Sequence, residues 1–412
     1  MKRGTPGFVG ARLREAREAR GLSVTALAEI LEVSRQSVSQ YENEQQSPRS
    51  EVMVKIEQVL NLPPAFFSRP VLKRPEARRI FYRSMKSATK LARVRVERRY
   101  EWLTEIANYL QEYVSFPPVR FPRFDVPRDA RELSWEDVED FAVRTREFWG
   151  LGEGPISNVV WLFENKGAIV TRSIVEADEL DAFSEWHGWQ ANSSTPYVFL
   201  GADKESAPRS RYDAAHELGH LVMHRNIDPK HIENQTTFKI IENQAHRFAG
   251  AFLLPTLAFS NDFSVANLDA FRALKPKWKV SVAMMVYRSQ DLDLVGKEQV
   301  RRLWINRTRR GWRLKEPLDD HLPIERPRML QRAFSMLVDE RIQSRDEIRT
   351  ALPYSAGDIA ELAGLPQNFL DEEPAPISLK AYTKKRSGST RSTHYGTGEI
   401  VDFRAARDSK EG

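Results

Sequence analysis

Hydrophobic residues near the start of the chain recur at the spacing of an amphipathic helix. Val9, Leu13 and Ala16 fall on one face of a helix predicted over residues 8–19. Gly21 follows directly, and glycine commonly ends a helix because it adopts the left-handed backbone conformation at little cost. The chain is therefore predicted to begin with a short helix that buries one apolar face.

Two more short helices are predicted immediately after the first. Ser23 is placed to cap a helix that carries Leu27, and Ser34 is placed to cap another that runs to about Glu42. Residues 31–33 make the turn between them. Two short helices in such close succession indicate a helix-turn-helix.

The hydrophobic pattern changes in the middle of the chain. A long helix is predicted through Trp102 and Leu110, before a run of prolines marks a boundary. Short segments rich in β-branched and aromatic residues then predict strands at 168–171, 182–186 and 197–200. These strands suggest a small antiparallel sheet.

From about residue 260 to residue 378 the pattern is mostly helical. Alternating residues at 303–314 favour a hairpin with its turn at Arg310-Gly311. The basic and aromatic residues of this stretch leave nucleic-acid contact as an alternative to a plain accessory role. Residues 380–412, rich in Lys, Arg, Ser and Gly, are predicted to be a disordered tail.

The amino-acid composition limits the possible metal ligands and shows where positive charge is concentrated. The 412 residues include no cysteine, so any metal must be held by His, Asp or Glu. The formal charge is +6, yet residues 73–99 alone hold eleven Lys or Arg against Glu76 and Glu97. That cluster suits nucleic acid or another polyanion, and equally a solvated helical face.

No membrane partner is expected. No apolar run approaches the roughly 18 residues that a membrane span needs. The first residues, Met1-Lys2-Arg3-Gly4, also lack the apolar core of a signal peptide. We therefore expect a cytoplasmic protein.

The third predicted helix turns polar side chains outward. Arg35, Gln36, Ser39 and Gln40 are side-chain types that read bases and hold phosphates, and Arg49 is a further phosphate candidate. Glutamine pairs bidentately with adenine, and arginine with guanine, when the start of such a helix enters the major groove. DNA is therefore the expected partner of this part of the chain.

Residues 22–48 resemble the lambda-repressor-like domain of the xenobiotic-response-element (XRE) regulators, from Leu22-Ser23-Val24 to Gln46-Ser47-Pro48. The resemblance covers about 60 residues and implies a five-helix domain whose third helix reads an operator. Such domains usually bind DNA as dimers, so a homodimer is expected.

A second motif, His216-Glu217-Leu218-Gly219-His220, has the spacing of a zinc site. Histidines four residues apart lie on one face of a helix, so both rings can reach one ion. Zn²⁺ with three protein ligands keeps one position for water and activates it. Glu217 beside that water is then the candidate general base.

The third ligand must come from another helix. Glu242 is the choice, because it shares a helical face with Ala245 and Ala249, whose small side chains permit close approach to Gly219. His246 is its rival, and is otherwise a hydrogen-bond donor to the transition state. His224, four residues beyond the motif, is expected to support the site or cap the helix end.

The segment from Thr195 to Pro255 resembles the ImmA/IrrE metallopeptidase family, and the resemblance extends over about 130–260. An XRE-like domain is a frequent partner of such domains. The resemblance implies a zinc-dependent endopeptidase of bacterial or phage origin. Some members cleave a repressor and so release a stress or mobile-element programme.

Two functions follow. The first is a DNA-binding regulator whose peptidase domain cleaves a protein, such as a repressor or antitoxin. Strand 182–187 is a candidate edge for pairing with an extended substrate, although the pattern favours an ordinary buried hairpin. The second is an XRE-family transcription factor or antitoxin-like repressor whose metal domain senses or scaffolds without proteolysis. Whether proteolysis is constitutive is left open.

The expected fold class is α+β. An all-α helix-turn-helix domain precedes a zincin-like domain, whose small antiparallel sheet packs on the active-site helices, and a mostly helical region follows. The predicted divisions are a DNA-binding domain at 1–70, a basic linker and bridging helix at 71–128, the metallopeptidase domain at 129–260, an accessory region at 261–378 and the basic tail at 379–412.

Overall fold

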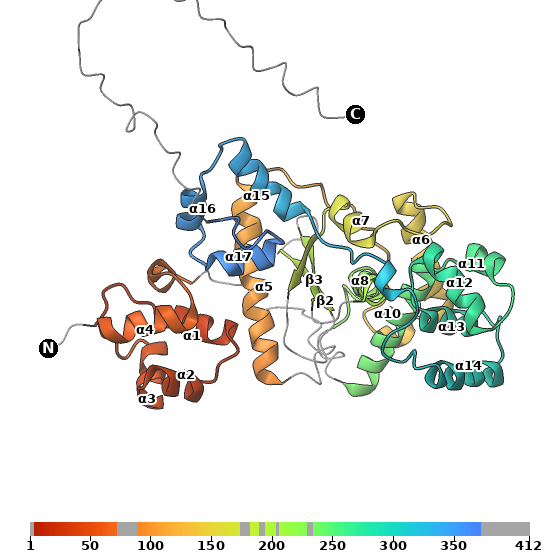
Figure 1. Cartoon of the computed structure of the whole chain (residues 1–412), viewed down its shortest axis with the longest axis horizontal. Coiled ribbons are helices and arrows are strands. Elements are labelled where there is room, and N and C mark those ends of the chain that lie inside the picture. Colours follow the sequence, from red (N-terminus) through yellow and green to blue (C-terminus); the bar gives the residue numbers. More distant parts are fainter. Residues whose placement is uncertain are drawn as a thin grey trace, which may run out of the picture. The chain divides into compact units, whose positions relative to one another are not determined.

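The structure is a computed structural model, and it describes residues 4–71, 89–173, 182–188, 194–202, 206–228 and 234–371. These described residues form one compact unit (Figure 1). Most of the basic cluster, at residues 72–88, and the predicted tail lie outside the described residues.

The N-terminal part is the predicted helical domain. Ser23 caps one helix by accepting a hydrogen bond from the Ala26 amide, and Ser34 caps the next through the Ser37 amide. Glu32 in the turn has a positive φ of 56°. The fifth helix implied by the resemblance is a short 3-10 helix. The elements are α1 (Gly10–Ala19), α2 (Val24–Leu31), α3 (Arg35–Glu42), α4 (Ser50–Leu60) and η1 (Pro64–Ser68).

The long predicted helix is α5 (Lys90–Gln111). Tyr100 and Trp102 are buried on different sides of it. The Tyr100 ring lies 5.5 Å from Tyr197 of the sheet, while the Trp102 indole donates a hydrogen bond to Glu15 of α1. Helix α5 therefore joins the N-terminal domain to the sheet.

The three predicted strands form one mixed sheet of order β1-β3-β2, with β1 (Ile169–Ser173), β2 (Ala182–His187) and β3 (Thr195–Gly201). Strands β2 and β3 are antiparallel as predicted, whereas β1 and β3 are parallel. The expectation of an antiparallel sheet was thus wrong for one strand pair. A hydrophobic pattern marks a strand but not the direction of its partner.

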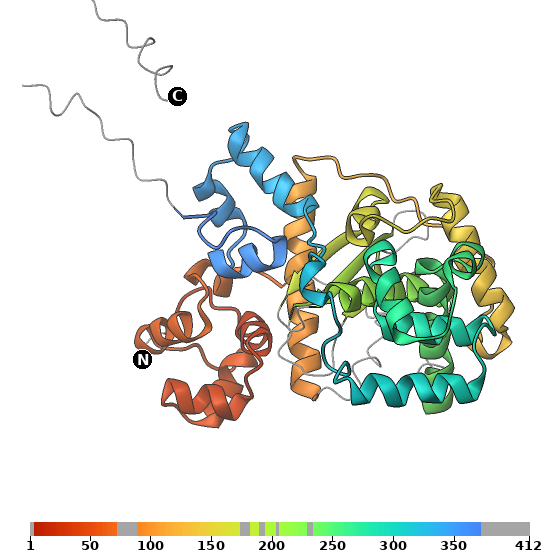
Figure 2. The same ribbon diagram turned by 45° about the vertical axis from the view of Figure 1, so that its right-hand side comes forward.

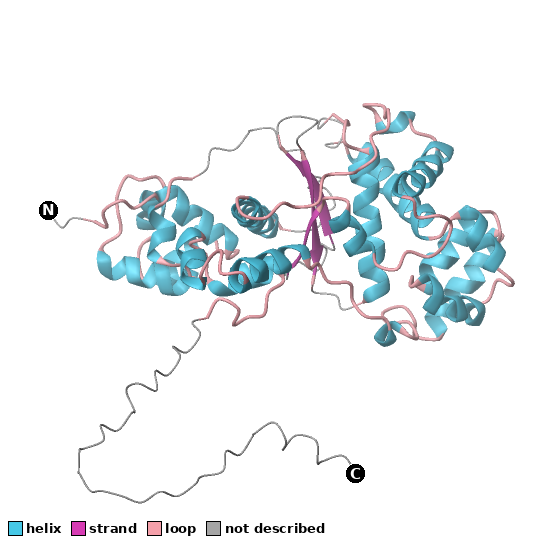
Figure 3. Ribbon diagram, turned by 90° about the horizontal axis from the view of Figure 1, so that it is seen from above, coloured by secondary structure: helices cyan, strands magenta, loops and turns pink. Residues whose placement is uncertain are grey.

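The sheet separates two hydrophobic cores (Figure 3). Phe183 and Tyr197 face the core that includes α5 and the N-terminal helices. Ala182 and Val198 face the core that contains the central helices. The central elements are η2 (Ala130–Glu132), α6 (Trp135–Trp149), α7 (Val159–Asn165), α8 (Ala207–Met223) and α10 (Gln235–Leu253).

Helices α8 and α10 approach closely at Gly219. A Cβ atom at this position would lie only 3.2 Å from the Ala245 Cα and 3.2 Å from the Phe248 ring. A larger side chain there would push α10 away from α8. This confirms that small residues permit the approach.

The C-terminal part is helical, as predicted, apart from the hairpin at 303–314. Helix α14 occupies most of that stretch, and Gly311, with a φ of 71°, follows its end. Val300 and Leu303 are one helical turn apart and both are buried. Their burial stabilises a helix, which outweighs the strand-like alternation of residues at 303–314. The elements are α11 (Thr256–Asp262), α12 (Leu268–Trp278), α13 (Val282–Asp291), α14 (Lys297–Arg309), η3 (Asp319–His321), α15 (Met329–Asp339), α16 (Arg345–Ala351) and α17 (Ala356–Ala363).

Helices α12 and α13 repeat the turn of the N-terminal helix-turn-helix. Lys279 ends α12 with a φ of 55°, close to the 56° of Glu32. Ser281 then caps α13 by accepting from the Met284 amide, as Ser34 caps α3. In both turns a valine separates the two residues. The chain thus contains a second helix pair of the same local geometry.

Candidate metal centre

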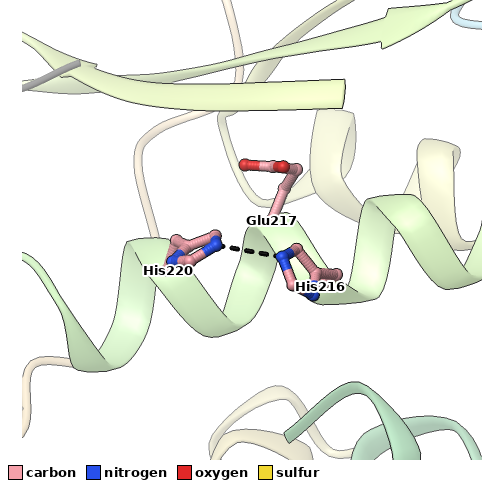
Figure 4. Close-up of side chains that lie close together, drawn as sticks. All are labelled: His216, Glu217 and His220. Atoms are coloured by element: carbon pink, nitrogen blue, oxygen red, sulfur yellow. Dashed lines mark hydrogen bonds between the residues drawn. The ribbon is translucent and has the colours of Figure 1, made fainter. Parts of the chain in front are cut away.

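One face of α8 brings the two motif histidines together. The Nε2 atoms of His216 and His220 are 3.0 Å apart, as Figure 4 shows. Both residues are buried. In the same view Glu217 points toward the strands, away from the contact between the two rings.

Glu242 reaches the same point from α10. Its Oε2 atom lies 3.4 Å from the His216 Nε2, and its Oε1 atom lies 3.4 Å from the His220 Nε2. Burial opposes ionisation of this carboxyl, but the two imidazoles hold the pKa of Glu242 well below its usual range. Two nitrogens and one carboxylate therefore converge on one position.

The spacing of these three groups fits a tetrahedral zinc ion. Ligand bonds of about 2.0–2.1 Å at tetrahedral angles place neighbouring ligand atoms about 3.3–3.4 Å apart. The observed separations are 3.0, 3.4 and 3.4 Å. Glu242 Oε1 is moreover buried with no hydrogen-bond partner among the described residues. A cation between the three groups would satisfy it.

A chain of hydrogen bonds orients His220. Its Nδ1 lies 3.0 Å from Nδ1 of His224, whose Nε2 lies 3.1 Å from Oε1 of Gln244. The Gln244 amide nitrogen donates to the Ala130 carbonyl at 2.7 Å. Because the amide nitrogen donates, Gln244 Oε1 must accept a hydrogen bond from His224 Nε2. The unprotonated Nδ1 of His224 then accepts from Nδ1 of His220. This leaves the Nε2 lone pair of His220 free to bind a metal. His224 also caps the end of α8, and burial lowers its pKa well below the usual value.

Glu217 is held on the other side of α8. The Ser184 hydroxyl of β2 donates to Glu217 Oε2 at 2.6 Å. Burial raises the pKa of Glu217 to about 7, although His216 and the Ser184 hydrogen bond both lower it. A carboxyl with such a pKa can accept and release a proton near neutral pH.

His246 lies beside the three converging groups. Its ring centroid is 4.4 Å from that of His216, and its Nδ1 is 2.6 Å from the Tyr212 hydroxyl. Burial raises the pKa of Tyr212 further above the neutral range, so the phenol stays protonated. With Tyr212 as donor, the imidazole of His246 carries its proton on Nε2. The structure therefore places His246 as a potential donor next to the site.

The expected DNA-contacting residues lie on α3 and at the start of α4. Arg35, Gln36 and Arg49 are exposed, whereas Ser39 and Gln40 are half-buried. Val38 points inward and is fully buried. Helix α3 thus offers a polar face outward, as the sequence predicts.

Three residues of the site were not identified from the sequence as participants. Ser184 is the polar member of an otherwise apolar strand face, and that position was its only signal. Gln244 is a neutral amide, a poor zinc ligand, and nothing in the sequence links it to His224. Tyr212, one helical turn before His216, carries no distinguishing pattern.

The fold and this cluster are those of a helix-turn-helix domain joined to a metallopeptidase-type domain. Residues 163–290 match the family model described as the IrrE N-terminal-like domain, Peptidase_M78. Residues 13–67 match the helix-turn-helix family model. The chain therefore contains an IrrE-like domain and an XRE-type DNA-binding domain.

The curated relatives match over a short segment only. A provisionally named HTH-type transcriptional regulatory protein of Methanococcus maripaludis strain C5 is 48% identical over 54 residues, which are 13% of this chain and 17% of that protein. A protein of the same description from Methanocaldococcus jannaschii is 44% identical over 54 residues, again 13% of this chain and 17% of the relative. Among the described residues, no helix has the length and apolar character needed to cross a membrane.

Proposed function

We propose that this protein is a DNA-binding transcriptional regulator with a zinc-dependent endopeptidase site that cleaves a repressor, an antitoxin or another regulatory protein. The observation that carries the proposal is the convergence of His216, His220 and Glu242 at separations of 3.0–3.4 Å. These are the distances expected between zinc ligands. Their side chains form the His₂Glu set of thermolysin-type sites.

A zinc ion bound there supplies Lewis acidity to a scissile carbonyl and lowers the pKa of a bound water. Glu217 accepts a proton on Oε1 while Ser184 holds its Oε2, and it later returns the proton to the leaving amine. His246, oriented by Tyr212, donates from Nε2 to the oxygen on which negative charge develops. The side chains of the site thus divide the tasks of binding, proton transfer and charge stabilisation.

The substrate would enter as an extended segment along β2. In the sheet formed by the described residues, β2 is an edge strand, and its Ser184 contacts Glu217. A peptide paired with this edge runs past the proposed zinc position. The requirement for an extended segment favours a flexible linker of a regulatory protein as the cleavage site.

The test uses the zinc-loaded full chain and a Glu242→Gln variant. We expect about one zinc per wild-type chain, and new protein N-termini when the wild type is added to an extract of cells that contain its regulon. Glu242→Gln should bind zinc weakly and produce none of these termini. Zinc absent from the wild type, or the same termini with both proteins, would reject the peptidase function and favour a regulator whose second domain only senses or scaffolds.

His224 provides a separate prediction about zinc affinity. Replacing His224 with Ala removes the acceptor that orients His220 while leaving all three proposed ligands in place. Such supporting residues usually change metal affinity by about 10–100-fold. Competition with a chromogenic chelator should show a weakening in this range, and His321→Ala, outside the site, should leave the affinity unchanged.

Substitutions in α3 test the proposed DNA contacts. Arg35→Ala and Gln36→Ala each remove a side chain proposed to read bases, at a cost of about 1–3 kcal/mol in operator discrimination. Genomic selection of bound fragments would identify the operator, and fluorescence anisotropy would compare the variants on it. Unchanged discrimination in both variants would remove α3 from base recognition. The expected dimer predicts two half-sites in that operator.

A further inference from the structure

Residues 297–315 carry the densest positive charge among the described segments of the C-terminal half. They hold eight Lys or Arg and one acidic residue, Glu298. Helix α14 forms most of this stretch, and it lies at the periphery of the described structure in both Figure 1 and Figure 2. Neither the proposed peptidase site nor the N-terminal domain accounts for this charge.

Most arginines of α14 face solvent because the opposite face of the helix packs against the protein core. Val300 and Leu303 are buried in the core, while Arg302 and Arg309 lie on the opposite side of the helix and are exposed. Arg301, Arg302, Arg309 and Arg313 form no hydrogen bond or ion pair with any described residue. Their neighbours Arg307 and Arg310 do pair, with Glu316 and Asp269.

Aromatic rings lie among these charges. The Tyr287 ring of α13 is 59% exposed and lies 4.8 Å from the ring of Trp304 on α14. The Arg307 guanidinium stacks near Trp304 at 5.6 Å, and that of Arg310 near Trp312 at 5.0 Å. Arginines interleaved with aromatic rings suit a nucleic-acid chain, because its phosphates pair with guanidinium groups and its bases stack.

Helix α13 is not a second base-reading helix, although its turn resembles that of the N-terminal domain. In α13 Val282 takes the position of Arg35 and is buried. Met285 and Val286 are buried as well. The helix-turn-helix geometry of α12 and α13 therefore serves packing, and the outward charge lies on α14.

We propose that the outward face of α14, with the chain up to Lys315, is a second nucleic-acid-binding surface that contacts the phosphodiester backbone without reading its sequence. A membrane fits less well. A helix that lies on a bilayer inserts its apolar face, whereas the apolar residues Val300 and Leu303 of α14 are enclosed in the protein core. The surface would hold DNA near the metallopeptidase-type domain independently of α3.

The experiment uses the full chain with Arg35→Ala and Gln36→Ala, so that α3 contributes no base contacts. In this background Arg302→Ala with Arg309→Ala removes two exposed charges, and Arg144→Ala with Arg349→Ala is the control. The control arginines are surface groups already paired with Asp140 and Asp346. Labelled probes are a duplex without operator sequence and oligo-dT of equal length, each titrated over a series of salt concentrations.

Each phosphate contact contributes about 0.9 to the slope of log affinity against log salt for a duplex, and about 0.7 for a single strand. We therefore expect the double variant to bind more weakly at low salt and to lose about 1.4–1.8 from that slope, with the control unchanged. Arg302→Lys with Arg309→Lys keeps the charge and should keep the slope.

A loss on the duplex alone would assign the surface to double-stranded DNA. A loss on oligo-dT alone, accompanied by weaker binding of Tyr287→Ala, would assign it to a single strand. Unchanged affinity and slope on both probes would overturn the proposal. So would binding to phosphatidylserine vesicles that disappears in the double variant while nucleic-acid binding persists.

Discussion

Glu217→Gln is expected to keep zinc and to lose proteolysis almost completely. Gln is nearly isosteric with Glu, and Glu217 is not among the three groups that converge at 3.0–3.4 Å. The amide cannot accept the proton that a carboxylate with a pKa of about 7 accepts. Loss of a positioned general base typically lowers the rate by about 10²–10⁴-fold.

The measurement pairs zinc content with the cleavage rate of the substrate identified from new N-termini. Ser184→Ala is the matched comparison, because it keeps the carboxylate and removes only the hydroxyl that holds Oε2. Since that hydrogen bond lowers the pKa of Glu217, its loss should move the acid limb of the rate profile to higher pH while activity remains. A Glu217→Gln protein that still cleaves at more than about a tenth of the wild-type rate would exclude Glu217 as the general base.

The local parts of the site could be predicted because helix geometry determines them. Histidines four residues apart must share a face, and the structure places His216 and His220 in contact. The approach of Glu242 was also predictable, because Ala245 is one of the small residues that let α10 come close to Gly219. In each case the relevant distance depends on one helix or on one pair of helices.

The parts that escaped prediction depend on the arrangement of the sheet. Ser184 reaches Glu217 because β2 pairs antiparallel with β3 and lies beside α8, and no local pattern of the strand contains that information. The parallel pairing of β1 with β3 was missed for the same reason.

The prediction of a hairpin at 303–314 was wrong for a different reason. Val300 and Leu303 lie one helical turn apart and are both buried, and this burial outweighs the alternation of a few residues.

Glu316→Ala is expected to cause the largest loss of stability. Glu316 accepts hydrogen bonds from the Val282 and Ala283 amides at the start of α13 and pairs with Lys275 at 3.1 Å. The Lys275 side chain is fully buried, and Asp319 at 2.6 Å is its other partner. Without Glu316 the buried Lys275 keeps only Asp319, and the Val282 and Ala283 amides lose their acceptor. Removing one member of a buried ion pair typically costs about 3–5 kcal/mol.

Chemical denaturation followed by tryptophan fluorescence would measure this loss, because Trp278 lies in α12, next to the affected pair. Lys315→Ala, which removes an exposed neighbouring charge, should leave the unfolding midpoint unchanged. In the double variant Lys275→Met with Glu316→Gln these two residues lose their charges together, while Asp319 remains, so the loss should be smaller than the sum of the two single losses. A loss below about 1 kcal/mol in Glu316→Ala would show that Asp319 alone compensates the buried charge of Lys275, and would reject Glu316 as a major source of stability.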